Sequence, residues 1–213
     1  MKRLLFIVLA MIATITSFAQ QKDVTSFLGI PVDGTVLSMK QKLVSKGFVP
    51  KKMGDLEWLE GEFNGTDVRV RIFTNKNKVY RILLADKNTM DEAQIKIRFN
   101  NLVSQYENNK RYIPLDKYTL SDEENISYEM TVNKKNYDAL FCQVPNMEKA
   151  DTLAELKNPS EEITKEYQNT AIKIGTELML MKIVWFSICE RDGEYYIKMF
   201  YDNEYNRSHG EDL

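Results

Sequence analysis

The alternation of apolar and polar residues predicts an antiparallel sheet in the first half of the chain. Over residues 67–74 the apolar side chains take every second position, as in a strand with one buried and one solvated face. Segments 56–63 and 79–85 have strand composition as well, and Asn64-Gly65 is a dipeptide that favours tight hairpin turns. We therefore expect a three-stranded meander.

Apolar residues at helical spacing predict an amphipathic helix on each side of this meander in the sequence. The first follows Thr35, a good N-cap, and ends at Gly47, which accepts left-handed backbone. The second begins at residue 88 or 89, with Glu92 placed for a capping box, and runs to about residue 108. Both helices need a sheet to cover their apolar stripes.

The remainder of the chain predicts more strands and one more helix. Strands are expected at 126–132 and 137–144, and a long hairpin at 183–203 around Asp192-Gly193. A third helix is expected to begin at Ser160. The fold class is therefore α+β, an antiparallel sheet with helices packed on one face.

A weak internal likeness suggests duplication. Residues 59–72 align without gaps on 128–141, which favours two helix-plus-meander units at 35–85 and 89–144, closed by the hairpin 183–203. The alternative is that two amphipathic hairpins resemble each other by chance.

The N-terminus has the three parts of a secretory signal peptide. Lys2 and Arg3 precede an apolar run, and Ser17 and Ala19 are small residues before a cut at Gln20. The alternative is an uncleaved anchor, but the run is shorter than the roughly 20 residues that span a bilayer. We expect a signal peptide at 1–19, a single domain at 20–213, no membrane-spanning segment after cleavage, and export to the periplasm or medium.

The composition limits the partners and cofactors that we expect. The net charge is −2, from 29 basic and 31 acidic residues, and the basic residues form no patch, so no nucleic-acid partner is expected. One histidine and two cysteines are too few for a multi-histidine site or a zinc ribbon. We therefore expect no metal and no cofactor.

No set of residues indicates a catalytic centre. The single histidine, His209, lies in the C-terminal tail, and no serine has the GxSxG pattern of a nucleophile elbow. Adjacent or alternating carboxylates at 60 and 62, 123 and 124, and 161 and 162 leave one enzymatic alternative, a small exported hydrolase that uses paired carboxylates.

Cysteines and aromatic residues gather on the later strands. Cys142 and Cys189 either form one disulfide or are two buried free thiols. A disulfide requires the predicted strand 137–144 to lie beside the predicted strand 183–190. The closing hairpin is aromatic on both faces, which suggests a binding surface. Its candidate residues are Trp185, Tyr195, Tyr196, Tyr201 and Tyr205.

Three segments resemble small exported proteins of Bacteroides-type bacteria: FLGIPVDGT (27–35), KLVSKGF (42–48) and YDNEYNRSHGEDL (201–213). In element order the chain is similar to the β-lactamase-inhibitor-protein-like and BamE-like α+β modules, although it lacks the lipid-anchor cysteine of BamE lipoproteins. These resemblances imply export and protein binding. We therefore expect a secreted or periplasmic, non-enzymatic binding module whose partner is a protein or envelope component; a purely structural envelope protein is a third option.

Overall fold

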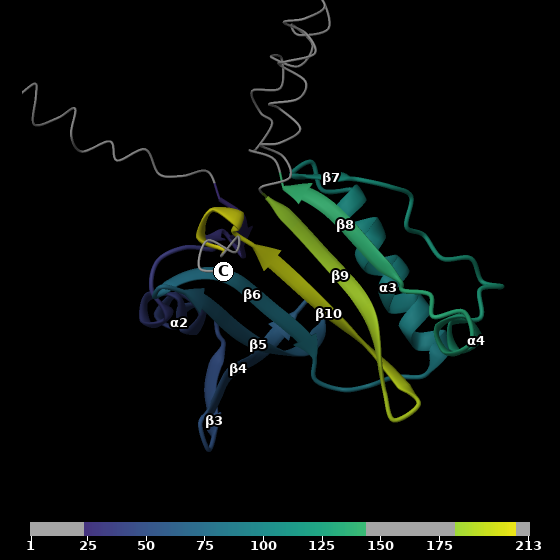
Figure 1. The fold of residues 1–213 in the computed structure, drawn as a ribbon, viewed down its shortest axis with the longest axis horizontal. Coiled ribbons are helices and arrows are strands. Elements are labelled where there is room, and N and C mark those ends of the chain that lie inside the picture. Colours follow the sequence, from purple (N-terminus) through teal and green to yellow (C-terminus); the bar gives the residue numbers. More distant parts are fainter. Residues whose placement is uncertain (1–23, 144–181, 208–213) are drawn as a thin grey trace, which may run out of the picture.

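The computed structural model describes residues 24–143 and 182–207, and these residues form an eight-stranded antiparallel sheet with helices on one face (Figure 1). The strand order is β3-β4-β5-β6-β10-β9-β8-β7. In chain order the strands are β3 (Val49–Met53), β4 (Leu56–Phe63), β5 (Thr66–Asn75), β6 (Lys78–Asp86), β7 (Tyr112–Pro114), β8 (Asp138–Gln143), β9 (Ile183–Arg191) and β10 (Glu194–Asp202). The expected α+β class is confirmed.

The sheet consists of two halves with the same order of elements. Helix α2 (Val36–Ser45) precedes the meander β3 to β6, and helix α3 (Glu92–Glu107) precedes β7 to β10. The halves meet where β6 pairs with β10, so their last strands lie side by side at the centre of the sheet (Figure 1). Two helix-plus-meander units therefore describe the topology, but the second unit runs through the closing hairpin to β10.

The residue alignment behind the expected repeat is wrong. It placed 59–72, which form β4 and β5, on 128–141, but residues 126–131 form a short helix, α4 (Ile126–Thr131). Alternating apolar residues had suggested a strand here. In the structure Ile126 is fully buried and Met130, one helical turn later, packs against the core, whereas Tyr128 and Val132 are more than half exposed. The pattern has period 2 and, over so short a segment, also fits the i, i+4 spacing of a helix.

Side chains at the start of α3 cap that helix and bond to the first turn of α4. The N-cap is Asp91, which with Gln94 forms the capping box, so the expected box that used Glu92 is wrong. The Glu92 carboxylate instead accepts hydrogen bonds from the backbone N–H of Ile126 (2.7 Å) and from the Ser127 hydroxyl (2.5 Å). A carboxylate at the first turn of α4 satisfies amide groups that have no partner within the helix.

The two predicted hairpin turns, Asn64-Gly65 and Asp192-Gly193, are confirmed, whereas neither edge strand of the sheet was expected. Asn64 and Gly65 have φ of 51° and 71°, and Asp192 and Gly193 have 57° and 81°, the positive angles of a two-residue turn. The sequence did not predict β3, which is exposed throughout, or β7, which has three residues. Short, charged or proline-containing edge strands discourage pairing with other chains, and they carry no alternating apolar pattern.

The core lies between the sheet and its two helices. Met39 and Leu43 of α2 and Phe99 of α3 are at most 1% exposed, and Phe99 makes an edge contact with Phe186 of β9 at 5.2 Å between ring centroids. A small hairpin of β1 (Ser26–Phe27) and β2 (Ile30–Pro31) inserts Phe27 into the same core. Every second residue of each central strand therefore faces the helices.

Several expectations concern residues outside the described part of the chain. These are the signal peptide at 1–19, the helix expected from Ser160, the carboxylate pair at 161 and 162, and His209. They stay predictions.

Candidate binding face

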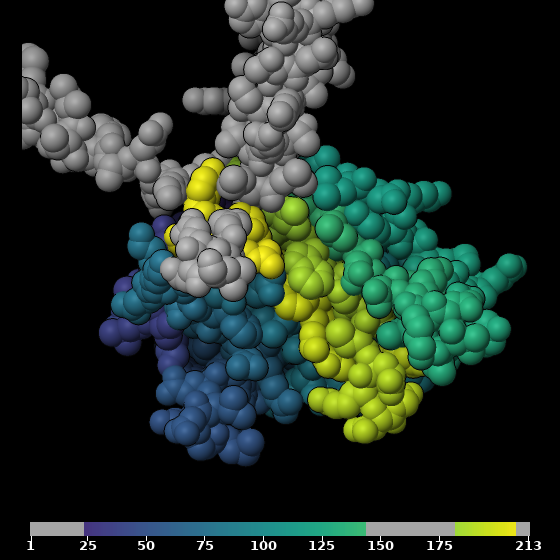
Figure 2. Space-filling model, viewed as in Figure 1, coloured from purple at the N-terminus to yellow at the C-terminus, as the bar shows by residue number. Residues whose placement is uncertain are grey.

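The sheet face opposite the helices is the candidate site, and Figure 2 looks onto it. Strand alternation turns one set of half-buried side chains of the central strands to this side. We call them the open face: Leu83 and Ala85 of β6, Tyr196, Lys198 and Phe200 of β10, Trp185 and Ser187 of β9, and Leu140 of β8. In Figure 2 the yellow strands β9 and β10 are visible between the blue first half and the green β8.

An aromatic stack occupies the middle of the open face. Trp185 and Phe200 are cross-strand partners, and their rings stack at 3.8 Å between centroids with an interplanar angle of 10°. The guanidinium carbon of Arg81 lies 5.0 Å from the Phe200 centroid and 5.9 Å from that of Trp185. A cation next to stacked rings adds attraction to the packing and holds them in place.

A buried aspartate fixes this stack from one end of β10. Asp202 is 4% exposed and accepts two hydrogen bonds from Arg81, at 2.5 Å from Nε and 2.7 Å from Nη2. It also accepts one from the Trp185 indole N–H at 3.2 Å. The carboxylate raises the pKa of Arg81, chiefly through these hydrogen bonds. Arg81 and Trp185 are thus held in one orientation by a single acceptor.

A shallow cavity of about 360 Å³ opens beside the stack. Trp185, Leu140 and Ile183 give it an apolar wall, and Arg81 and Arg207 line it together with Asp138, Asp202 and Glu204. An apolar centre with a rim of both charge signs is the composition found at protein–protein interfaces.

The five aromatic residues expected to form a surface are divided by the sheet. Trp185 and Tyr196 lie on the open face, and Tyr205, at 38% exposure, lies in the short 3-10 helix at 204–206. The prediction that Tyr195 and Tyr201 lie on the surface is wrong, because their side chains are 6% and 2% exposed and face the helices. The predicted alternation of the hairpin is confirmed, and only one of its faces is available to a partner.

Cys142 and Cys189 are both free thiols in the structure. Their strands β8 and β9 are neighbours, as a bridge requires, but Cys142 pairs with Ile183, six residues before Cys189. Six residues of a strand span about 20 Å, and a disulfide needs α-carbons within about 7 Å. Burial raises the pKa of both thiols, which favours the unreactive neutral form. The disulfide alternative is therefore wrong for this structure.

In each described carboxylate pair, one member has a lowered pKa. Glu60 accepts hydrogen bonds from Trp58 and Lys87, and these hold the pKa of its carboxyl below the usual value. Lys135 and Tyr137 lower the pKa of Glu124 in the same way. A general acid needs a raised pKa to keep its proton near neutral pH, so Glu60 and Glu124 do not have the environment of a general acid.

Arg81, Asp202 and Leu140 complete the site, and no pattern in the sequence distinguishes them from other strand residues. A strand pattern assigns residues to a face, but it does not say that β6 and β10 pair and place Asp202 opposite Arg81. Within residues 24–143 and 182–207 no group of three potential metal ligands occurs. In the same part of the chain no helix has the length and apolarity to cross a membrane.

Comparisons with family models, with curated proteins and with solved structures found no match to this chain.

Proposed function

We propose that the protein is an exported, non-enzymatic binding module that engages a protein partner through the open face. The observation that carries this proposal is the stack of Trp185 on Phe200, fixed by Arg81 and Asp202 at the centre of a sheet face turned away from both helices. Tryptophan, tyrosine and arginine are the residues most enriched among those that dominate binding energy at protein interfaces.

The dimensions of the face support a protein rather than a small ligand. Eight strands about 4.8 Å apart span about 34 Å, and the nine-residue strands β6, β9 and β10 are about 30 Å long. The face therefore offers at most about 1,000 Å², and a partner in a stable complex typically covers about 800 Å². A single surface of that size suits one folded partner.

Preorganisation supports the same proposal. The Trp185 ring is stacked, hydrogen-bonded and next to a cation before any partner binds, so little side-chain entropy is lost when a partner covers it. Export rests on the sequence pattern of residues 1–19, and the resemblance to periplasmic protein-binding modules agrees with it.

The test is a comparative capture from the envelope fraction of the native host. Immobilised wild-type protein, Trp185→Ala and Tyr128→Ala are incubated with that fraction, and bound proteins are quantified by mass spectrometry. Tyr128 is the matched control, because it is 54% exposed on α4, away from the open face. The purified partner is then titrated against each variant.

We expect one partner that binds wild type and Tyr128→Ala equally and Trp185→Ala at least tenfold more weakly, about 1.4 kcal/mol or more. Circular dichroism checks that both variants are folded. A partner whose affinity is the same for Trp185→Ala as for wild type contradicts the proposal. The absence of any specific partner, together with catalytic turnover by the protein on a substrate panel, also contradicts it.

A further inference from the structure

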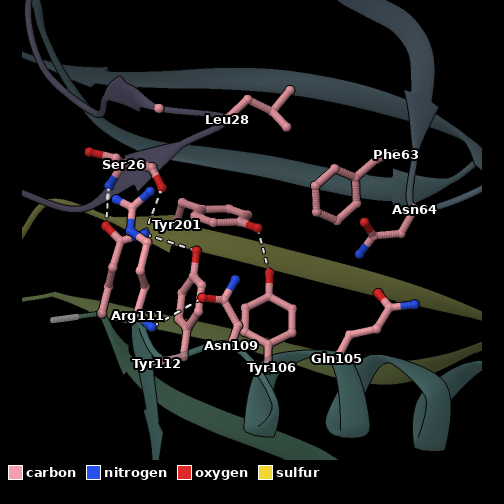
Figure 3. Close-up of a pocket in the computed structure, with 12 residues that line it drawn as sticks. Ser26, Leu28, Phe63, Asn64, Gln105, Tyr106, Asn109, Arg111, Tyr112 and Tyr201 are labelled. Atoms are coloured by element: carbon pink, nitrogen blue, oxygen red, sulfur yellow. Dashed lines mark hydrogen bonds between the residues drawn. The ribbon is translucent and has the colours of Figure 1, made fainter. Parts of the chain in front are cut away.

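A second cavity, on the helix side of the sheet, has the features of a small-ligand site. It has a volume of about 410 Å³ and lies between the β1–β2 hairpin, the β4–β5 turn, the end of α3 and the start of β7 (Figure 3). Ligand pockets commonly measure 300–1,000 Å³. Because the lining comes from both halves of the fold, a ligand here would contact both.

Arg111 is the one charged side chain among the described residues that line this cavity. Its Nε is buried and has no hydrogen-bond partner in the described part of the chain. Leaving a charged donor buried without an acceptor is unfavourable, so natural proteins seldom keep one without a reason. Arg111 also brings a positive charge to the wall of the cavity, and an anion there would pair with its guanidinium.

The groups around Arg111 form hydrogen bonds with one another and none with its Nε. Gln143 is 4% exposed, and its amide accepts from Ser26 N at 2.6 Å and donates to Ser26 O and to the Tyr112 hydroxyl, both at 2.9 Å. The Arg111 backbone N–H donates to the Asn109 side chain at 3.0 Å. These bonds fix the walls of the cavity and leave the Arg111 Nε unpartnered.

Three tyrosines form the body of the cavity. Tyr106 and Tyr201 point toward each other from α3 and β10, with their hydroxyl oxygens 2.5 Å apart, and the Tyr106 and Tyr112 rings lie 4.6 Å apart between centroids (Figure 3). Burial raises the pKa of all three hydroxyls, so they stay neutral and the cavity keeps the single positive charge of Arg111.

The two ends of the cavity differ in chemistry. Figure 3 shows Arg111 beside Ser26 at one end and the amides of Asn64 and Gln105 at the other, with the Tyr106–Tyr201 pair between them. One guanidinium matches one planar carboxylate in a two-point hydrogen bond, whereas a phosphate dianion calls for more positive charge. Aromatic walls accept a flat ring, and amides accept or donate to a polar substituent.

We propose that this cavity binds a small aromatic monocarboxylate, with its carboxylate on Arg111, its ring against the tyrosines and a polar substituent near Asn64 and Gln105. This site is separate from the open face, since Tyr201 faces the helices and Phe200, its neighbour in β10, faces the other way.

Isothermal titration calorimetry of the full chain with 4-hydroxybenzoate tests the proposal. The matched ligands are 4-hydroxybenzamide, which is neutral and of similar shape, and inorganic phosphate. The matched variants are Arg111→Gln and Arg191→Gln, which remove the same charge. Arg191 is exposed at the end of β9 and lies over Tyr196, outside the cavity.

We expect saturable binding of 4-hydroxybenzoate that weakens at least tenfold in Arg111→Gln and is unchanged in Arg191→Gln. The benzamide and phosphate should bind at least tenfold more weakly than 4-hydroxybenzoate. The ligand-free melting temperature of Arg111→Gln should equal or exceed that of wild type, since an unpartnered buried donor is removed. Equal binding by Arg111→Gln, equal or tighter binding of either matched ligand, or no saturable binding to wild type would overturn the proposal.

Discussion

Replacement of Asp202 by asparagine tests whether one carboxylate holds the open face together. Asp202→Asn preserves shape, but it removes the charge and turns an amide N–H₂ toward one of the two Arg81 donors. The side chains of Asp202 and Arg81 are 5% and 20% exposed. Removing one partner of a fully buried ion pair costs about 3–5 kcal/mol, and the partial exposure of Arg81 allows some hydration, so we expect about 2–3 kcal/mol.

The assay is urea unfolding followed by circular dichroism, with thermal unfolding as a second readout. For a chain of this size each kcal/mol shifts the melting temperature by about 2–4 °C, so Asp202→Asn should lower it by roughly 5–10 °C. Arg81→Met and the double variant complete a cycle. Because the double variant leaves no unpaired charge, it should be about as stable as the less stable single variant, or more so.

Two results would refute this reasoning. The first is a loss below about 0.5 kcal/mol in Asp202→Asn, which is the size expected of an exposed pair. The second is strict additivity in the cycle, which would mean that Arg81 and Asp202 do not depend on each other.

Three further predictions concern other parts of the chain. Glu92→Ala should lower the free energy of unfolding by about 2 kcal/mol at neutral pH. Hydrogen bonds, led by that of Ser127, hold the pKa of the Glu92 carboxyl below its usual 4.5, so this loss should disappear as the pH falls through the lowered pKa. Urea unfolding from pH 3 to pH 7 measures the loss, with the exposed Glu107→Ala as control, and a loss that does not depend on pH would contradict us. Gly61→Ala should lower the free energy of unfolding by about 1–3 kcal/mol, because a new Cβ would lie 2.6 Å from the Phe48 ring. Adding Phe48→Leu should restore part of that stability, and an unchanged urea midpoint in Gly61→Ala would refute the prediction. We expect N-terminal sequencing of the protein purified from its host to begin at residue 20, and an intact residue 1 would contradict the proposed signal peptide.

Elements with a strong local signal could be predicted from the sequence. The strands of the 56–85 meander and of the closing hairpin combine clean alternation with a positive-φ turn, and the structure places β4 at Leu56–Phe63 as expected. Helix α3 has four successive turns of apolar residues, so its type could be predicted, although its N-cap, Asp91, lies two or three residues after the expected start. In these segments local preference and tertiary packing agree.

Elements that depend on distant partners could not be predicted. The first backbone N–H of helix α4 donates to Glu92, 34 residues earlier in the chain, and no local pattern of period 2 or 3.6 distinguishes the helix from a strand. The candidate site has the same limitation. Strand alternation separates Tyr196 and Phe200 from Tyr195 and Tyr201, but the ion pair that fixes the aromatic stack arises from the register between β6 and β10. The orphaned Arg111 Nε likewise arises only from packing.

The most direct test of the central claim is a footprint of the open face in the complex with the captured partner. Hydroxyl-radical labelling followed by mass spectrometry measures the modification rate of individual aromatic side chains in the free and bound protein. We predict that partner binding protects Trp185 and Tyr196 and leaves the exposed Tyr128 of α4 unchanged. Unchanged labelling of Trp185 and Tyr196 in a saturated complex would contradict the account.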